Sequence, residues 1–286
     1  MTLRSCVVAL ALGGLAGATT VFALAGGLAA EESGIPYRDG EYNSVPAPEG
    51  SSLSELISGY YFRTPETREL QDDEFMNPAF IWTERAEELW STTDGQVGKA
   101  CADCHADATE TMAGVGATYP KYHEASGKLI NLEQRINLCR TENMEAEPWK
   151  WESDELLGMT AYVRHQSFGM PVDVAIDGPA APFFEKGKDF YYQRRGQLDM
   201  ACATCHETNY GMYIRADLLS QGHSNGFPTY RLKWQKIGSL HRRIRGCNRQ
   251  VRSTPYPAGA DEYVNLELYL AWRGQGLPVE APSVRQ

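Results

Sequence analysis

The apolar residues divide the chain into a leader and a longer region of short amphipathic segments. Residues 7–30 are rich in Ala, Gly, Val and Leu; the basic residue Arg4 precedes them and Glu31 follows. This order is typical of a secretory signal peptide, so we predict a signal at 1–30, cleaved near Ala30, and export to the periplasm. The apolar run is somewhat long for a signal, and an uncleaved membrane anchor is the alternative. We predict no membrane span in the mature chain.

A helix is predicted just after residue 180. Pro182 is suited to the first turn of a helix, and four residues then fall on one face at i, i+4, i+7 and i+8: Phe183, Gly187, Phe190 and Tyr191. The spacing predicts an amphipathic helix with this face against a core.

Two further helices are predicted to begin after Ser153 and after Ala260, each with an Asp-Glu pair in its first turn. The residues expected on their buried faces have matching spacing: Met159 and Tyr162 in the first, Leu266 and Tyr269 in the second. With 27 Gly and 15 Pro, turns are frequent between the helical segments, so we predict a mainly α chain of short elements.

These segments belong to an internal repeat. Segment 86–105 matches 187–206 at an offset of 101, and segment 154–171 matches 261–278 at an offset of 107. The repeat predicts two tandem units from an internal duplication, 76–176 and 180–286. An N-terminal extension, 31–75, precedes them.

The charge balance limits the partners. The chain carries 37 acidic against 27 basic residues, a net charge of −10, and removal of the leader with Arg4 makes it more negative. An acidic surface argues against nucleic acid or an anionic membrane as a partner. Solubility alone is a sufficient reason for such a balance.

The cysteines carry the clearest chemical signal. Cys6 lies in the leader, and four of the remaining six form two CxxCH motifs: Cys101-Ala-Asp-Cys104-His105 and Cys202-Ala-Thr-Cys205-His206. In c-type attachment two thiols bond the vinyl groups of one porphyrin, and the adjacent imidazole binds the iron. A zinc or redox CxxC site needs no His after each pair. We therefore predict two covalently bound haem c groups, with His105 and His206 as proximal ligands.

With a helix before each motif and a closing helix after it, the two units resemble small cytochromes c. In that fold a small residue on the first helix lets the last helix cross closely. Ala86 and Gly187 occupy the matching position in the two units.

The residues available in each unit limit the candidates for the sixth iron ligand. After His206 the only methionine is Met212, too close to the motif to reach the opposite haem face. The second unit can use His223, His241, Cys247 or a lysine, or stay open; the first offers Met144, Met159, Met170 and Cys139. Cys139 and Cys247 correspond at an offset of 108. We favour thiolate ligation by both over the alternative, a disulfide between them.

A cationic strip surrounds Cys247. Five arginines occur within eleven residues: Arg242, Arg243, Arg245, Arg249 and Arg252. Arginine binds oxyanions with a bidentate fork and lowers the pKa of a nearby thiol. A solvated basic face or contacts to haem propionates are the alternatives, but beside an oxidisable thiolate the strip favours anion binding. The segment around Cys139 has Arg135 and Arg140 but also several glutamates.

The paired distal cysteines and the Arg243-x-x-x-Cys247 segment make the mature chain similar to SoxA, the dihaem subunit of the SoxAX cytochromes. The resemblance implies an L-cysteine S-thiosulfotransferase, which oxidatively joins thiosulfate to a cysteine of the carrier protein SoxYZ. Electrons would pass through haem to the monohaem partner SoxX and on to a cytochrome c acceptor. The resemblance also implies that Cys247 is the distal ligand of the second haem and the catalytic sulfur, held as a persulfide, and that Arg243 binds thiosulfate.

Two other functions fit the haem motifs alone. A dihaem electron carrier would need no anion site, and a dihaem peroxidase would need an open or displaceable sixth position at one iron. The arginines beside Cys247 favour the transferase over the carrier, and low-spin thiolate signals at both irons in electron paramagnetic resonance would exclude the peroxidase.

Overall fold

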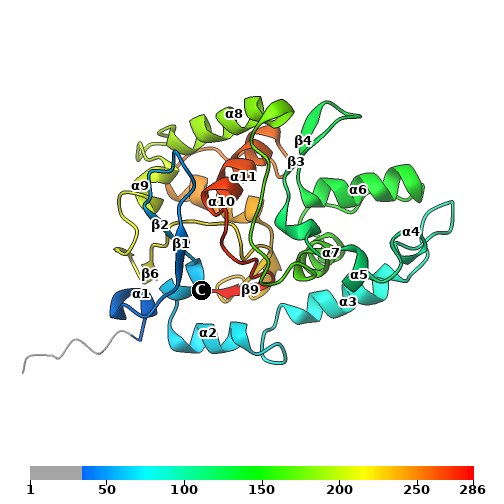
Figure 1. Cartoon of the computed structure of the whole chain (residues 1–286), viewed down its shortest axis with the longest axis horizontal. Coiled ribbons are helices and arrows are strands. Elements are labelled where there is room, and N and C mark those ends of the chain that lie inside the picture. The colour runs from blue at the N-terminus through cyan, green and yellow to red at the C-terminus, as the bar shows by residue number, and fades with distance from the viewer. Residues whose placement is uncertain (1–33) are drawn as a thin grey trace, which may run out of the picture. The chain divides into compact units, whose positions relative to one another are not determined.

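Two crossed helix pairs organise the chain. The computed structural model describes residues 34–286, so the predicted signal peptide lies outside the described residues (Figure 1). In the first pair, α3 (Phe80–Trp90) packs on α7 (Asp154–His165); in the second, α8 (Ala181–Tyr192) packs on α11 (Asp261–Arg273). The predicted starts of α7 and α11 are confirmed, with Ser153 and Ala260 as the N-cap residues.

Each crossing depends on a glycine. A Cβ on Gly187 of α8 would lie 2.0 Å from the carbonyl oxygen of Asn265, so the prediction for Gly187 is confirmed. In the first pair the close approach is made by Gly158 of α7, where a Cβ would lie 2.6 Å from the carbonyl oxygen of Trp82. The predicted small residue of α3, Ala86, is buried and faces this glycine, with its Cβ 3.5 Å from where a Cβ on Gly158 would lie. Only one of the two facing positions has to lack a side chain.

Between the helices of each pair, a motif helix, an antiparallel pair of strands and a longer helix follow in the same order, with different short elements inserted after the motif helix. In the first series these are α4 (Ala102–His105), α5 (Ala108–Thr111), η2 (Val115–Ala117), β3 (Lys121–His123), β4 (Lys128–Ile130) and α6 (Leu132–Asn143). In the second they are α9 (Cys202–His206), β5 (Tyr213–Ile214), β6 (Asp217–Leu218), β7 (Thr229–Arg231), β8 (Lys236–Gly238) and α10 (Leu240–Gln250). Before α8 lies η3 (Gly178–Ala180), and after α11 the strand β9 (Ser283–Arg285) pairs in parallel with β7.

The segments that follow α7 and α11 pair with each other. The Gly169 N–H donates to the carbonyl of Val279 at 2.9 Å, and the Gly276 N–H donates to the carbonyl of Val172 at 2.8 Å. Gly169 corresponds to Gly276, and Val172 to Val279, at the offset of 107. The two hydrogen bonds are thus related by exchange of the two halves of the chain.

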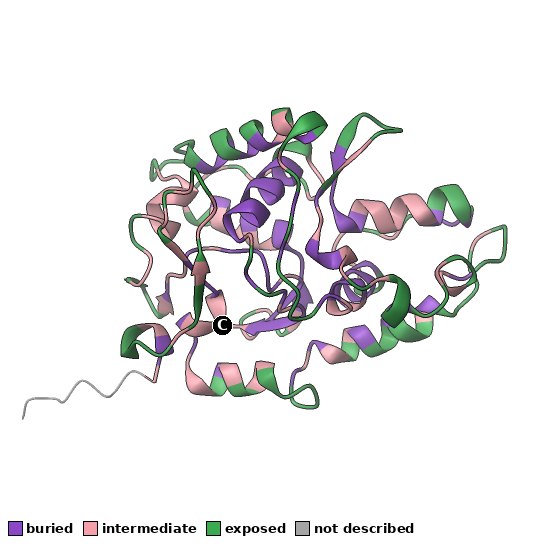
Figure 2. Ribbon diagram, viewed as in Figure 1, coloured by how far each residue is buried: buried purple, intermediate pink, exposed green. Residues whose placement is uncertain are grey.

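The core is centred on α11, which is buried from Tyr263 to Arg273 (Figure 2). The buried face of α8 differs from the prediction at one position: Phe184 is buried and Phe183 only partly so. The Phe184 ring lies 5.1 Å from that of Trp272 on α11 in an edge-on contact, and this contact turns α8 away from the predicted face.

Residues 34–75 form an ordered extension rather than a flexible arm. Its elements are α1 (Pro36–Asp39), β1 (Ser44–Pro46), β2 (Glu55–Ile57), η1 (Gly59–Phe62) and α2 (Pro65–Asp72). Ile57 and Phe62 pack with Leu218 in a small core of their own, and α2 lies beside β9 (Figure 1). Among the described residues, none of the helices combines the length and the apolarity needed to cross a membrane.

Candidate functional site

Each CxxCH motif forms a short helix at the end of a crossed pair, and the environment of His206 on α9 is suited to an iron ligand. Its Nδ1 donates to the carbonyl of Ser220 at 2.8 Å, since a carbonyl can only accept. Burial lowers the pKa of His206 to about 4, so the ring is neutral and Nε2 keeps its lone pair for a metal. Gly222, with φ +78°, closes the pocket behind the ring: a Cβ there would lie 2.6 Å from His206 Cγ. These features fit a c-type haem.

The first motif supplies the same groups, two thiols and one imidazole, in a different environment. The indole of Trp90 lies 5.8 Å from the His105 ring, and its Nε1–H donates to the carbonyl of Ala106 at 2.9 Å. Burial lowers the pKa of His105, with Arg135 adding to the shift. This site also fits haem.

The thiols of the motifs do not have the character of a redox pair. Burial raises the pKa of Cys202 to about 12, and it also raises the pKa values of Cys101 and Cys205. Reactive CxxC thiols have lowered pKa values, so the structure argues against the redox alternative. Within residues 34–286, no group of three or more His, Cys, Asp or Glu side chains is arranged to hold a metal ion.

Cys139 and Cys247 occupy matching positions, each the eighth residue of its helix, in α6 and α10. Cys247 adds to the raised pKa values of Cys202 and Cys205, and Cys139 adds to that of Cys101, because each distal thiol lies near its own motif. Both distal thiols are free, and no disulfide joins them in the described part of the chain.

The two histidines that the sequence left as alternative ligands have other partners. His223 donates from Nε2 to the Gln221 side-chain oxygen at 2.9 Å. His241 stacks on Trp151 with ring centroids 5.1 Å apart, and its Nδ1 accepts from the Gly259 N–H at 3.0 Å. Met212 is 62% exposed.

Arg243 lies one helical turn before Cys247, on the same face of α10. Its charge lowers the pKa values of Cys205 and His206, so it acts on the side where the motif lies. A second arginine, Arg231 of β7, joins it. Burial and then Arg243 lower the pKa of Arg231 to about 10, while Asp217 and, less strongly, Cys247 oppose this shift. Two positive charges therefore act near Cys247.

The predicted strip of five arginines is not one continuous surface, because α10 distributes them around its axis. Arg242 stacks over Trp234 at 4.5 Å and lies 3.8 Å from Glu152. Arg249 and Arg252 are exposed. Of the five, Arg243 is the one a full turn from Cys247.

Sequence reasoning missed Arg231, which comes from another element. Its counterpart in the first half, at the offset of 108, is His123, whereas Arg243 corresponds to Arg135. An arginine present in only one copy of the repeat was the signal in the sequence that could have identified Arg231.

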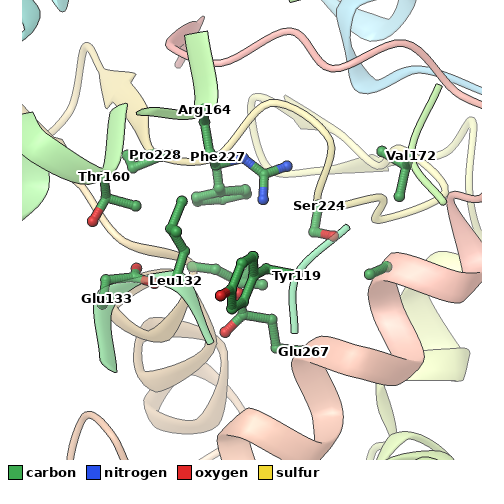
Figure 3. Close-up of a pocket in the computed structure, with 12 residues that line it drawn as sticks. Tyr119, Leu132, Glu133, Thr160, Arg164, Val172, Ser224, Phe227, Pro228 and Glu267 are labelled. Atoms are coloured by element: carbon green, nitrogen blue, oxygen red, sulfur yellow. The ribbon is translucent and has the colours of Figure 1, made fainter. Parts of the chain in front are cut away.

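A separate polar cavity lies between the two halves (Figure 3). Its volume is about 10 Å³, near the lower limit for one water molecule. Glu133, Arg164 and Glu267 line it, and Asn131 donates to Glu267 at 3.0 Å. No cysteine or motif histidine lines it, so it is distinct from the haem sites.

Comparisons with known proteins agree with this chemistry. Residues 85–172 match the SoxA/TsdA cytochrome c domain. The chain is 49% identical over 241 residues to the L-cysteine S-thiosulfotransferase subunit SoxA of Pseudaminobacter salicylatoxidans, covering 84% of each chain. It is 44% identical over 283 residues to that of Paracoccus pantotrophus, covering 99% of this chain and 97% of the relative. The crystal structure of SoxXA from P. pantotrophus superposes with a TM-score of 0.82, covering 86% of this chain and 93% of that one.

Proposed function

The chain belongs to the SoxA family of L-cysteine S-thiosulfotransferase subunits, and from this premise we propose that its sulfur chemistry takes place at Cys247. As a SoxA-type cytochrome c it carries covalent haem c and works in a complex with SoxX. The observation that carries the proposal is the convergence of Arg243, Arg231 and the Cys247 thiol beside the second CxxCH motif.

Two haem groups are proposed, one at each motif. Cys101 and Cys104 attach the first, and Cys202 and Cys205 attach the second. His105 and His206 are the proximal ligands; the hydrogen bond from His206 Nδ1 to Ser220 supports this role. When bound, the haem irons supply one-electron acceptors.

Thiolates are the proposed distal ligands, Cys139 at the first haem and Cys247 at the second. The matching positions of these two residues in α6 and α10 support the assignment. In the second half, His223 and His241 make hydrogen bonds to other groups, so they are not the main candidates to replace Cys247 as the iron ligand.

Thiosulfate is the proposed substrate at Cys247. It is a dianion, and two partly desolvated guanidinium groups attract it more strongly than exposed ones would. Arg243 is the principal binding residue, and Arg231 adds a second positive charge. His123 replaces this second arginine in the first half, which supports placing the reaction at the second haem.

The reaction forms one sulfur–sulfur bond. The sulfane sulfur of thiosulfate joins a cysteine sulfur of the carrier, the carrier thiol releases one proton, and two electrons leave. Cys247, held as a persulfide, is the proposed site at which the sulfane sulfur reacts. The nearby arginines hold the anion.

The carrier is proposed to be a SoxYZ-type protein, and the final acceptor a cytochrome c. Export to the periplasm remains a proposal based on the leader.

A tandem duplication is proposed as the origin of the fold, with units 76–176 and 180–286. The shared order of motif helix, strand pair and cysteine-bearing helix supports it. So do the reciprocal hydrogen bonds between Gly169 and Val279 and between Gly276 and Val172, because exchange of the two units converts one bond into the other.

The proposal is tested with the purified heterodimer, a SoxYZ-type carrier and thiosulfate. We expect Cys247→Ala to abolish thiosulfate conjugation while intact mass spectrometry still shows two attached haems. Cys139→Ala is the matched control and is expected to retain conjugation. Full activity of Cys247→Ala would favour an electron carrier without sulfur chemistry of its own.

A further inference from the structure

The segment behind His206 is held by the N-terminal extension, through one buried side chain. Gln221 lies between Ser220, whose carbonyl accepts the His206 hydrogen bond, and Gly222, whose Cα faces the His206 ring. The Gln221 residue is 0% exposed, and its side chain reaches β2 of the extension.

The Gln221 amide pairs with β2 as a neighbouring strand would. Its Oε1 accepts from the Ile57 N–H at 2.8 Å and from His223 Nε2 at 2.9 Å, and its Nε2 donates to the Glu55 carbonyl at 3.2 Å. Leu56, between these two residues, is opposite Val45 of β1. The N–H and the carbonyl at the free edge of β2 thus both bond to one side chain, which is 164 residues from Ile57 in sequence.

The backbone of Gln221 is fixed from the opposite side. Arg273 of α11, which is 1% exposed, donates from its guanidinium to the Gln221 carbonyl at 2.9 Å. The Arg273 guanidinium is held in turn by Glu207 at 3.4 Å and lies over the Tyr191 ring at 4.5 Å. With its side chain bound to β2 and its carbonyl bound to α11, Gln221 cannot move without breaking buried hydrogen bonds.

We infer that Gln221 is a positioning residue for the proximal ligand of the second haem, and that the N-terminal extension sets this ligand through it. The inference rests on the proposed role of His206. A hydrogen bond at Nδ1 fixes the orientation of an iron-bound imidazole and raises its basicity. A Ser220 carbonyl held 2.8 Å from His206 Nδ1 would therefore influence the reduction potential of the iron bound by His206.

The first motif provides an internal contrast. Within the described residues the His105 ring makes no hydrogen bond; it contacts Trp90 instead. The extension contacts the second half through Leu218 and Gln221. A change at Gln221 should accordingly alter one haem and leave the other as a reference in the same molecule.

The test replaces Gln221 by Met, which has similar length but can neither pair with β2 nor accept the hydrogen bond from His223. We expect the reduction potential of the second haem to shift upward and its electron paramagnetic resonance g values to change, with the first haem unmoved. The kcat for thiosulfate conjugation should fall about tenfold, with KM nearly unchanged, because Gln221 does not contact the substrate.

The matched control is Gln71→Met. Gln71 also joins the extension to the second half, accepting from the Val284 N–H at 3.1 Å and from the Arg285 guanidinium, and among the described residues it makes no hydrogen bond to residues 220–222. We expect it to leave both potentials and both sets of g values unchanged. If Gln221→Met does not yield a folded heterodimer, Gln221→Asn, too short to reach both groups of β2, carries the same expectation.

Two outcomes overturn separate claims. If the wild type shows the signal of a His/thiolate haem at the second site and Gln221→Met leaves its potential and g values unchanged, Gln221 has no positioning role. If the wild type lacks that signal, the proposed ligation itself is wrong.

Discussion

At the scale of single residues, the proposed chemistry depends on one turn of α10. Arg243 and Cys247 could be predicted as a pair from sequence because i, i+4 spacing brings side chains together on any helix. Arg231 could not, because its position depends on how β7 packs beside α10. The other arginines of the strip are directed elsewhere for the same helical reason, and Arg249 is exposed.

Replacing Arg243 tests substrate binding. We expect Arg243→Ala to raise the KM for thiosulfate about tenfold to a hundredfold, because a charge-assisted contact is worth about 1.5–3 kcal/mol. The effect should diminish in high salt, where wild-type binding is also screened. Steady-state kinetics with varied thiosulfate measure it.

Arg249→Ala is the matched control, since it removes an exposed arginine from the same helix. Its KM should stay within about twofold of wild type. Equal effects of the two substitutions would show that general positive charge, rather than a site at Arg243, attracts the substrate.

At the scale of elements, periodicity predicted where the main helices lie but not how they meet. The N-terminal signals at Ser153 and Ala260 are local, so they could be seen in sequence. The rotation that buries Phe184 instead of Phe183 depends on Trp272 of α11, and at the first crossing the glycine that faces Ala86 lies on the last helix, at Gly158. Both details are decided by the partner helix.

The crossing of α8 and α11 gives a stability prediction. Gly187→Ala would place a Cβ 2.0 Å from the Asn265 carbonyl oxygen, so α8 must move away from α11. We expect the free energy of unfolding to fall by about 1–3 kcal/mol or more, in denaturant titrations of the haem-loaded protein.

Lys188→Ala, on the exposed face of the same helix, is the control and should change the free energy of unfolding by less than about 0.5 kcal/mol. A Gly187→Ala protein as stable as the wild type would show that the two helices are not closely packed there.

At the scale of the whole molecule, the junction between the two halves could not be predicted from sequence. The repeat predicted two units, but it did not reveal the charged groups enclosed between them. Burial and the facing Glu267 raise the pKa of Glu133 to about 7, while His241 and Arg164 oppose the shift. The folded protein therefore keeps a proton on Glu133 that the unfolded chain releases at lower pH.

This raised pKa gives a pH dependence with a definite sign. The stability associated with protonated Glu133 is fully present below about pH 4.5 and is lost as the pH rises through about 7. We expect Glu133→Gln to remove this loss, so its stability relative to wild type should increase from pH 5 to pH 8 by up to about 3 kcal/mol. Denaturant titrations across this pH range measure it.

Glu155→Gln, an exposed carboxylate on α7, serves as the comparison and should keep the wild-type pH profile. A Glu133→Gln protein with that same profile would mean that Glu133 is ionised in the folded state throughout.

The most direct measurement locates the sulfur. The heterodimer is exposed to thiosulfate with an oxidised acceptor, digested without reductant, and mapped by peptide mass spectrometry. We expect the peptide that contains Cys247 to carry added sulfur and the peptide that contains Cys139 to carry none. Added sulfur on Cys139, or an unmodified Cys247 in protein that is turning over, would contradict the assignment of the reaction to Cys247.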